Sequence, residues 1–306
     1  MKGPCTVTPS SPLSPPTLLP ASLVSTVWLA DHLGMPGLVV ADIRGYVKAT
    51  PLGGGKETAA YLAARDEYDA GHILGAVYVD WTRDIVDLDD PVPTQIAPPD
   101  RFADAMSSRG IGDDVDVVVV DHTGGHFATR LWWALRYYGH DRVAILDGGF
   151  NAWQREGRVM TTEVPSPAVA TFTPAIRPEL RQTWDQVAAE IATGERVIID
   201  ARDAPVFRGE TWRGSRAGHI PTAVNVSWKR FVGEDGLWRQ PDAIRAMLAE
   251  AGIAGDTPVV AYCNGGVTAT ATLFAMYLAG NDDGANYDGS WNEWGERDDL
   301  PVTTGP

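Results

Sequence analysis

The chain has 306 residues, of which 44% are hydrophobic and 21% charged, a composition typical of a soluble globular protein of about two domains. Its 25 Lys and Arg residues against 40 Asp and Glu residues give a formal net charge of −15, which argues against a nucleic-acid or anionic-membrane partner. Two cysteines cannot form a disulfide framework, and no apolar stretch approaches the ~20 residues that cross a bilayer. A cytoplasmic location is therefore expected.

The first 21 residues contain Cys5 and many prolines and serines, and they predict a disordered tail. The rest of the sequence contains an internal repeat. V-V-A-D-I-R at 39–44 resembles V-I-I-D-A-R at 197–202, and A-G-H-I-L-G-A-V-Y-V-D-W at 70–81 resembles A-G-H-I-P-T-A-V-N-V-S-W at 217–228. A β-branched run ending at Asp121 matches one ending at Cys263, and D-G-G-F-N-A-W at 147–153 matches D-G-S-W-N-E-W at 288–294. The matches keep their order, so we expect two copies of one domain, over residues 22–160 and 181–306.

The two copies are expected to be joined by a stiff, proline-rich linker over residues 161–180. Within each copy, short β-branched runs alternate with helix-like segments at 99–109, 128–138, 242–251 and 269–279. This alternation predicts an α/β fold in which each domain has a mainly parallel sheet flanked by helices. Open parallel sheets bind ligands beyond the carboxyl ends of their strands, so the residues that follow each strand are the candidates for function.

Cys263 follows one such strand and begins the sequence C-N-G-G-V-T-A, which leads into a predicted helix. Two adjacent glycines let successive backbone amides converge, and the start of a helix adds further unpaired amides. Amides arranged in this way favour a thiolate and would also hold a persulfide sulfur or an incoming anion. We predict Cys263 as a nucleophile within a binding loop of Asn264, Gly265, Gly266, Val267 and Thr268. The alternative is a buried structural thiol.

The first copy has Asp121 in the place of Cys263, so only the second copy can perform thiol chemistry. The duplicated G-H-I-x-x-A motif, the D-x-R before it, the D-G-[GS]-[FW]-x-x-W after it and the C-x-x-G-V-T-A loop together resemble the tandem-domain rhodanese family of sulfurtransferases. The resemblance covers nearly the whole chain after the tail. It implies two tandem rhodanese-like domains and transfer of a sulfane sulfur, through a Cys263 persulfide, from thiosulfate or 3-mercaptopyruvate to cyanide or a thiol. No cofactor is implied.

Three positions depart from the patterns of this family and bear on the sulfur donor. Thiosulfate enzymes tend to have basic residues after the cysteine and mercaptopyruvate enzymes have C-G-S-G-V-T-A, whereas C-N-G-G-V-T-A matches neither. Val206 stands where mercaptopyruvate-type relatives have a substrate-binding arginine, and Gln95 lies in the region where they have a histidine. The last two differences favour thiosulfate or another sulfane donor, and 3-mercaptopyruvate stays open.

An anionic donor in such an acidic protein requires a local basic pocket, for which Arg208 and Arg213 are the candidates. Arg44 and Arg202, which occur at matching places in the repeat, are interpreted as structural ion-pair partners.

The glycine loop between His122 and His126 and the lack of a third ligand argue against a metal site. The run G-G-G-K-E-T at 53–58 lacks the spacing of a phosphate-binding loop and predicts a flexible insertion near the domain interface.

Two other functions compete with sulfur transfer. A cysteine phosphatase or arsenate reductase needs the pattern Cys-x5-Arg, and Ala269 at the last position argues against both. A persulfide-carrying or sensing module that binds protein partners without efficient turnover stays open, because the loop sequence and Val206 both depart from the family pattern.

Overall fold

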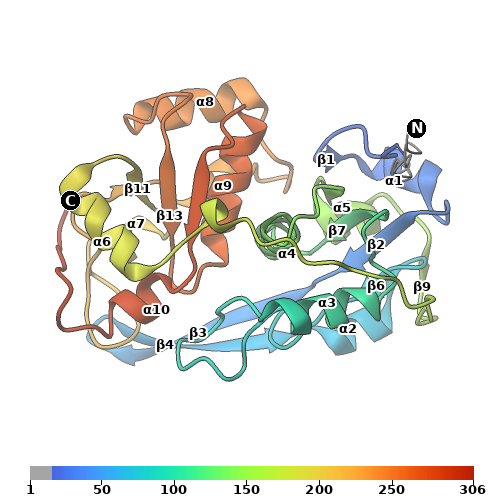
Figure 1. Cartoon of the computed structure of the whole chain (residues 1–306), viewed down its shortest axis with the longest axis horizontal. Coiled ribbons are helices and arrows are strands. Elements are labelled where there is room, and N and C mark those ends of the chain that lie inside the picture. The colour runs from blue at the N-terminus through green and yellow to red at the C-terminus, as the bar shows by residue number, and fades with distance from the viewer. Residues whose placement is uncertain (1–15) are drawn as a thin grey trace, which may run out of the picture.

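The computed structural model describes residues 16–306 (Figure 1). Residues 1–15, with Cys5 and most of the predicted tail, lie outside the described residues. The prediction that the tail extends to residue 21 is wrong. Thr17 Oγ1 and the Leu18 amide donate hydrogen bonds of 2.6 and 2.7 Å to the carboxylate of Asp116, so a buried acidic side chain already fixes the chain there.

Two five-stranded parallel sheets form the centres of two domains. In the first sheet the strands follow the order β1 (Leu23–Val24), β8 (Val143–Leu146), β7 (Asp116–Val120), β2 (Leu38–Asp42), β6 (Val77–Tyr78). In the second they follow the order β10 (Arg181–Gln182), β14 (Gly284–Tyr287), β13 (Val259–Tyr262), β11 (Val197–Asp200), β12 (Val224–Asn225). The two orders are identical once each strand is matched to its repeat. The predicted duplication and the predicted parallel sheets are confirmed.

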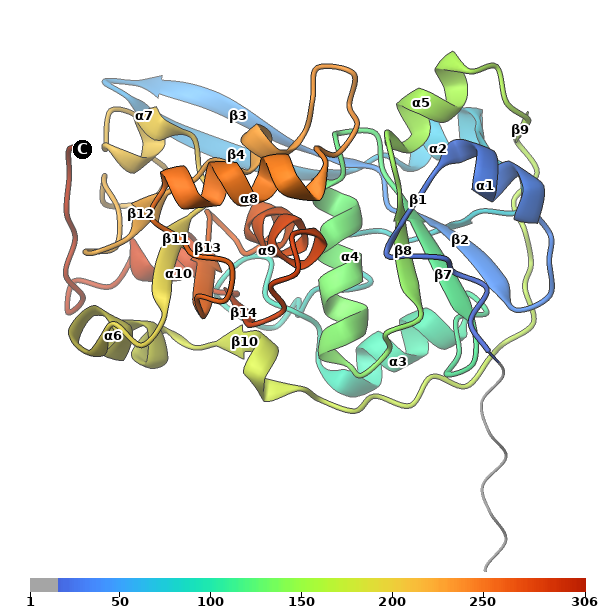
Figure 2. The same cartoon turned by 90° about the horizontal axis from the view of Figure 1, so that it is seen from above.

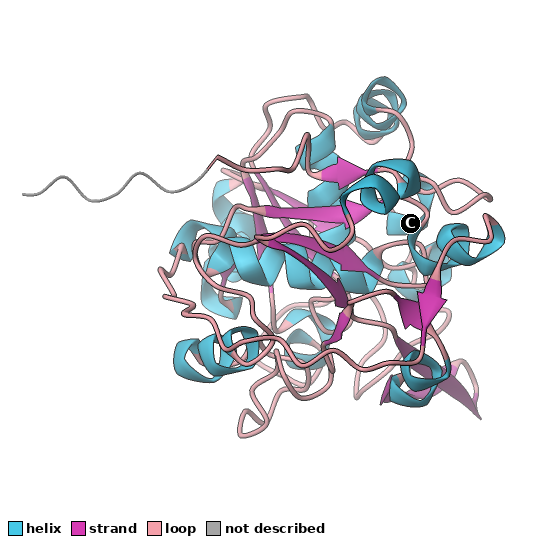
Figure 3. Cartoon of the chain, turned by 90° about the vertical axis from the view of Figure 1, so that its right-hand side faces the viewer, coloured by secondary structure: helices cyan, strands magenta, loops and turns pink. Residues whose placement is uncertain are grey.

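Helices cover both faces of the strands (Figure 3). In the first domain these are α1 (Thr26–His32), α3 (Pro99–Ser107), α4 (His126–Tyr137) and α5 (Gly149–Arg155). Their repeats in the second are α6 (Trp184–Thr193), α8 (Pro241–Glu250), α9 (Thr268–Leu278) and α10 (Ser290–Trp294). The helices predicted from the sequence agree with α3, α4, α8 and α9 to within two residues. Both α3 and α8 begin with a proline, whose fixed φ and missing N–H suit the first position of a helix.

Short elements complete the fold: α2 (Arg65–Ala70), α7 (Ala204–Phe207) and the 3₁₀ helices η1 (Pro178–Leu180) and η2 (Trp228–Phe231). The strands β5 (His72–Ile73) and β9 (Met160–Thr161) pair antiparallel. Residues 162–177 then run along the first domain without helix or strand, held by hydrogen bonds such as that from the Ala175 amide to the Tyr138 carbonyl oxygen, 2.9 Å. No helix within residues 16–306 combines the length and apolar character needed to cross a membrane.

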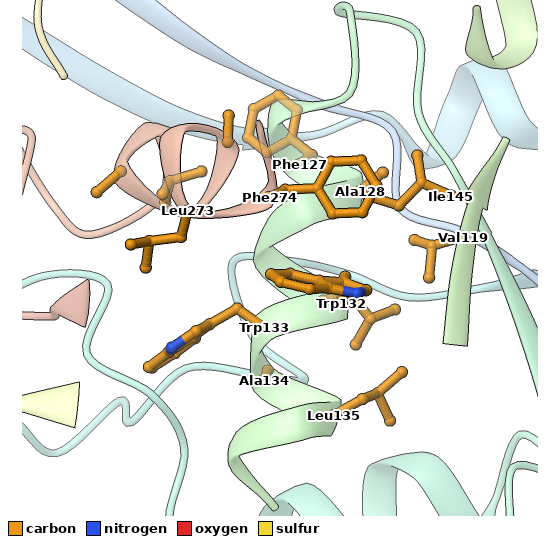
Figure 4. Close-up of a cluster of buried hydrophobic side chains, with 14 of the residues drawn as sticks. Val119, Phe127, Ala128, Trp132, Trp133, Ala134, Leu135, Ile145, Leu273 and Phe274 are labelled. Carbon is orange, nitrogen blue, oxygen red and sulfur yellow. The ribbon is translucent and has the colours of Figure 1, made fainter. Parts of the chain in front are cut away.

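The two domains share one hydrophobic core. Helices α4 and α9, which follow the two matching loops, lie against each other, and buried residues of both belong to one cluster (Figures 1 and 4). The ring centroids of Trp132 on α4 and Phe274 on α9 are 5.0 Å apart in an edge-to-face arrangement, and both side chains are almost fully buried. The domain interface is thus packed like a protein interior.

A long antiparallel hairpin leaves the first domain and reaches the second. It consists of β3 (Gly45–Gly53) and β4 (Lys56–Ala63), and Figures 1 and 2 show it extending beside the second domain. The G-G-G run is therefore the tip of an antiparallel hairpin with an irregular register at Pro51–Gly53, and it lies near the domain interface as predicted. The run is also informative, because Gly53, Gly54 and Gly55 all have positive φ, which glycine adopts without strain.

Backbone hydrogen bonds hold the tip of this hairpin to the second domain. The Trp212 amide donates to the Gly55 carbonyl oxygen at 3.0 Å, and the Glu57 amide donates to the Trp212 carbonyl oxygen at 2.8 Å. A Cβ atom at Gly55 would lie 2.3 Å from the carbonyl oxygen of Glu210, so the contact leaves no room for a side chain. The β3–β4 hairpin of the first domain thus reaches the carboxyl ends of the strands of the second sheet.

Candidate active site

A cavity of about 470 Å³ lies at the carboxyl ends of β11 and β13, between the two domains. Cys263, directly after β13, is one of its lining residues and is only 3% exposed. The hairpin contributes Val47, Ala49, Glu57 and Tyr61 to the wall, and α4 contributes His126. Residues of both domains therefore build the site, although only the second has the cysteine.

Four of the five predicted loop residues line this cavity: Asn264, Gly265, Val267 and Thr268. Gly266 lies behind it, where its amide donates to Ser290 Oγ at 2.9 Å. Gly266 has φ +68°, and a Cβ atom there would lie 2.7 Å from Asp288 Oδ1, so this position requires glycine. Within the described chain, no hydrogen bond engages the amides of Gly265, Val267 or Thr268, and these N–H groups are available to a ligand.

The matching loop of the first domain shows what amides at this place in the fold can bind, although Gly125 has φ 99° where its counterpart Val267 has φ −86°. Asp121 Oδ1 accepts hydrogen bonds from the amides of Gly125 at 2.9 Å and Thr123 at 3.2 Å. Its Oδ2 accepts from the amides of Phe127 at 2.9 Å and Ala128 at 3.2 Å. Four amides thus converge on one anionic side chain. With the offset of 142 residues between the loops, Thr123, Gly125 and Phe127 correspond to Gly265, Val267 and Ala269.

Three cationic residues line the cavity, against two acidic ones, in a chain whose net charge is −15. Arg202 pairs with Asp200 at 2.6 Å, as predicted for a structural ion pair, yet its buried Nη1 has no partner in residues 16–306. Arg213 Nε lies 3.8 Å from the carboxylate of Glu57 on the hairpin. Lys229 Nζ lies 2.6 Å from Asp203. The cavity wall thus has one more cation than carboxylates, and each cation lies near a carboxylate.

Of the two predicted anion-binding arginines, the structure brings only Arg213 into the cavity wall. Arg208 is not among the lining residues, and its guanidinium pairs with Glu210 at 2.6 Å. Arg208 directly follows α7 as its C-cap residue. Val206 does line the cavity, as an apolar residue. Gln95 does not line it; its Oε1 accepts a hydrogen bond from Arg181 Nη2 at 3.0 Å.

Aromatic side chains form another part of the wall. The centroid of the His126 ring lies 4.7 Å from that of Trp228, and burial lowers the pKa of His126 below its ordinary value, which favours the neutral imidazole. Burial raises the pKa of Tyr61, whose hydroxyl accepts a hydrogen bond from Asn292 at 3.1 Å. His122 lines a separate cavity of about 390 Å³ in the first domain, so the two histidines do not converge.

Sequence reasoning missed Lys229, Trp228 and the hairpin residues. Trp228 belongs to the second copy of the repeated G-H-I segment, and Lys229 follows it shortly after β12, so the rule of carboxyl strand ends would have found both. The hairpin carries a different signal. In the structure the exposure of the side chains alternates from Lys56 to Ala63, but the sequence K-E-T-A-A-Y-L-A does not alternate polar and apolar residues, so the glycine turn before it was the only signal of a hairpin.

The profile of the rhodanese-like domain matches residues 25–156 and 183–297. A thiosulfate sulfurtransferase of Cricetulus griseus is 34% identical over 283 residues, 89% of this chain and 91% of the relative. A sulfur carrier protein of Thermus thermophilus is 32% identical over 299 residues, 94% of this chain and 98% of the relative. A 3-mercaptopyruvate sulfurtransferase of Escherichia coli is 35% identical over 282 residues, 91% of this chain and 96% of the relative.

A crystal structure of a 3-mercaptopyruvate sulfotransferase from Escherichia coli has the same fold, with a TM-score of 0.77 and 32% identity over 88% of this chain and 98% of that one. The chain belongs to the rhodanese family, with two rhodanese-like domains in tandem. The resemblance found in the sequence is therefore confirmed, and the names of the relatives support sulfur transfer as its activity.

Proposed function

We propose that this protein is a sulfurtransferase that moves a sulfane sulfur from a small anionic donor to a thiol or cyanide through a persulfide on Cys263. The observation that carries this proposal is the pair of matching loops. One loop directs four amides at the carboxylate of Asp121, and the other has a cysteine at the same place, beside a cavity with three cationic residues in its wall. Such a loop stabilises a thiolate and the negative charge of a persulfide.

The reaction would proceed in two displacements. The Cys263 thiolate attacks the outer sulfur of thiosulfate, the S–S bond breaks, and sulfite leaves with the electron pair. A cyanide ion or an acceptor thiolate then attacks the outer sulfur of the persulfide, and the Cys263 thiolate leaves, regenerated. With 3-mercaptopyruvate as donor, the carbon–sulfur bond breaks instead and the enolate of pyruvate leaves and takes up a proton. Neither donor's series of displacement steps needs an oxidant or a cofactor.

We infer thiosulfate as the preferred donor. Val206 presents an apolar side chain to the cavity where an arginine for a carboxylate is expected in the mercaptopyruvate group, and Gln95 lies outside the cavity wall. Arg213, Lys229 and the partnerless Nη1 of Arg202 supply positive charge for a small anion.

The test is to incubate the protein with either donor and to search for one added sulfur by intact mass, followed by thiocyanate formation with cyanide. We expect the added sulfur on Cys263, faster from thiosulfate, and no activity in Cys263→Ser. Cys5→Ser is the matched control, because it removes the other cysteine, and it should retain full activity. Full activity in Cys263→Ser, or no added sulfur from either donor, would contradict the proposal.

A second candidate function is a persulfide carrier that delivers sulfur to a protein partner without efficient turnover of small acceptors. The name of the Thermus thermophilus relative, a sulfur carrier protein, favours this candidate. The same experiment separates the two. A stable persulfide that forms on Cys263 but reacts slowly with cyanide and small thiols would favour the carrier, whereas rapid thiocyanate formation would favour the enzyme.

A further inference from the structure

Arg130 on α4 crosses from the first domain to the back of the cysteine loop. Its Nη1 donates to the carbonyl oxygen of Gly266 at 3.1 Å and to Asp288 Oδ1 at 2.5 Å, and its Nη2 donates to the carbonyl oxygen of Thr94 at 2.7 Å. Arg130 and Asp288 are 1% and 0% exposed. An ion pair this deeply buried persists only when its hydrogen bonds are satisfied, so its geometry is closely defined.

Thr94, also from the first domain, holds the neighbouring peptide of the same loop. Its Oγ1 lies 2.7 Å from the carbonyl oxygen of Gly265 and 2.5 Å from that of Pro93, and its one proton is shared between these two acceptors. Thr94 has φ 70°, an unfavourable region for a β-branched residue, which the surrounding contacts must maintain. A Cβ atom at Gly265 would lie 2.3 Å from Thr94 Oγ1, which explains why this chain has glycine there.

The direction of these contacts determines where the loop amides point. In a trans peptide the C=O and the following N–H point in opposite directions, and no peptide among the described residues is cis. Arg130 and Asn286 Nδ2, the latter at 3.1 Å, draw the Gly266 carbonyl oxygen away from the cavity. The Val267 amide is therefore directed to the opposite side, toward the cavity that Val267 lines. Its counterpart in the first domain, the Gly125 amide, donates to Asp121 at 2.9 Å.

The two loops are thus stabilised in different ways. In the first domain the Asp121 carboxylate binds the amides from within the loop. Cys263 offers no such carboxylate, so the mutual repulsion of converging N–H dipoles must be offset from outside. The contacts of Arg130 and Thr94 are on the outer side of the loop and come from the domain that lacks the cysteine.

We propose that Arg130 and Thr94 are positioning residues of the cysteine-free domain: Arg130 orients the amide of Val267 toward the Cys263 sulfur, and Thr94 fixes the preceding peptide, whose Gly266 amide donates to Ser290 Oγ. This inference rests on the proposed function in that it assigns these residues to the reactivity of Cys263. The first domain is then a working part of the site, because without its contacts the peptide between Gly266 and Val267 can rotate and its N–H no longer faces the sulfur.

The experiment uses full-length protein with Cys5→Ser, so that alkylation by iodoacetamide reports on Cys263 alone. Thr94→Val keeps the shape of the side chain and removes its hydrogen bond to Gly265, and Arg130→Met removes the contact to Gly266. The matched control is Arg136→Met, since Arg136 also lies on α4 and also crosses the interface, to Asp282 at 2.8 Å, but does not contact the loop. Arg130→Met/Asp288→Asn, which removes both charges of the fully buried pair, takes the place of Arg130→Met if that variant does not fold.

We expect Thr94→Val and the Arg130 variant to lower the alkylation rate at slightly acidic pH by about tenfold, with recovery at alkaline pH, where any thiol ionises. The kcat for sulfur transfer should fall by a similar factor while KM for the donor stays within about twofold, because the misdirected amide no longer stabilises the charge on sulfur. Arg136→Met should match the parent. Folded variants with the parent's alkylation rate would overturn the inference. Alkylation does not depend on any sulfur donor, so failure of sulfur transfer in the parent would count against the proposed function alone.

Discussion

Asp121 and Cys263 occupy equivalent positions, each directly after the strand at the centre of its five-stranded sheet. In one copy of the fold the loop encloses its own carboxylate, and in the other it surrounds a thiol beside a cavity of about 470 Å³. The two copies of the loop therefore differ in role: the loop after Asp121 binds its own carboxylate, and the loop after Cys263 is open to a ligand.

The first prediction concerns the stabilising role of Asp121. Asp121→Ala should lower the free energy of unfolding by about 3 kcal/mol, because buried amides lose their acceptor. Asp121→Asn, which keeps one acceptor oxygen, should cost less. Urea unfolding followed by circular dichroism measures both. Unchanged stability in Asp121→Ala would mean that water replaces the carboxylate without cost.

The second prediction distinguishes the two candidate arginines. Arg213→Met should raise KM for thiosulfate about tenfold, because a charge-assisted contact to an anion is lost from the cavity wall. Arg208→Met is the matched control, since Arg208 lies five residues before Arg213 but pairs with Glu210 outside the cavity wall. The KM of this variant for thiosulfate should stay within about twofold of the parent's. Steady-state thiocyanate formation at varied thiosulfate checks both. Equal KM values in the two variants would remove Arg213 from the proposed site.

The third prediction tests the hairpin as part of the cavity wall. Gly54 and Gly55 both have positive φ, so replacement by alanine strains the backbone of each. Only at Gly55 would the new Cβ meet the second domain, 2.3 Å from the Glu210 carbonyl oxygen, whereas nothing lies within 4 Å at Gly54. Gly55→Ala should therefore detach the hairpin tip and lower kcat/KM several-fold more than Gly54→Ala. Limited proteolysis should cleave the hairpin faster in Gly55→Ala; identical cleavage and kinetics would argue that the tip contact has no role.

The fourth prediction is a pH dependence of stability. Burial lowers the pKa of His140 below its ordinary value of 6.5, and its buried Nε2 has no hydrogen-bond partner in the described structure. Below about pH 6.5 the unfolded chain binds a proton at this residue that the folded chain does not, so the free energy of unfolding falls as the pH falls. His122 and His126, whose pKa values burial also lowers, act in the same direction.

His140→Gln should reduce that slope by up to about 1.4 kcal/mol per pH unit. Urea unfolding of the parent and the variant at several pH values between about 5 and 7.5 measures the slopes in the window set by the ordinary histidine pKa. Parallel profiles for the two proteins would show that His140 titrates alike in the folded and unfolded chains.

The repeat made much of this architecture predictable. Apolar runs such as β7 and β13 can only be central strands of a sheet covered on both faces, and a repeated order of motifs implies a repeated order of strands. The position of Cys263 after such a strand also located the cavity. These inferences succeeded because they depend on local patterns that the chain carries twice.

Contacts between the copies were not predictable in the same way. The repeat indicates that the domains have the same fold, but it contains no information on how they pack against each other. The sequence therefore did not indicate that Tyr61 and His126 line the same cavity as Cys263. The same holds for the pairing of Arg130 with Asp288, residues 158 positions apart. Arg208 failed as a candidate for a local reason: Glu210, two residues on, binds its guanidinium.

The core that α4 and α9 share also bears on how this protein unfolds and how it can be divided. Trp132 and Phe274 cover each other across the interface, so we expect an excised second domain to present an apolar face to water and to associate with itself. We expect the two copies to melt in a single cooperative transition. The shared core predicts that the duplicated halves, although each has its own sheet, fold as one unit.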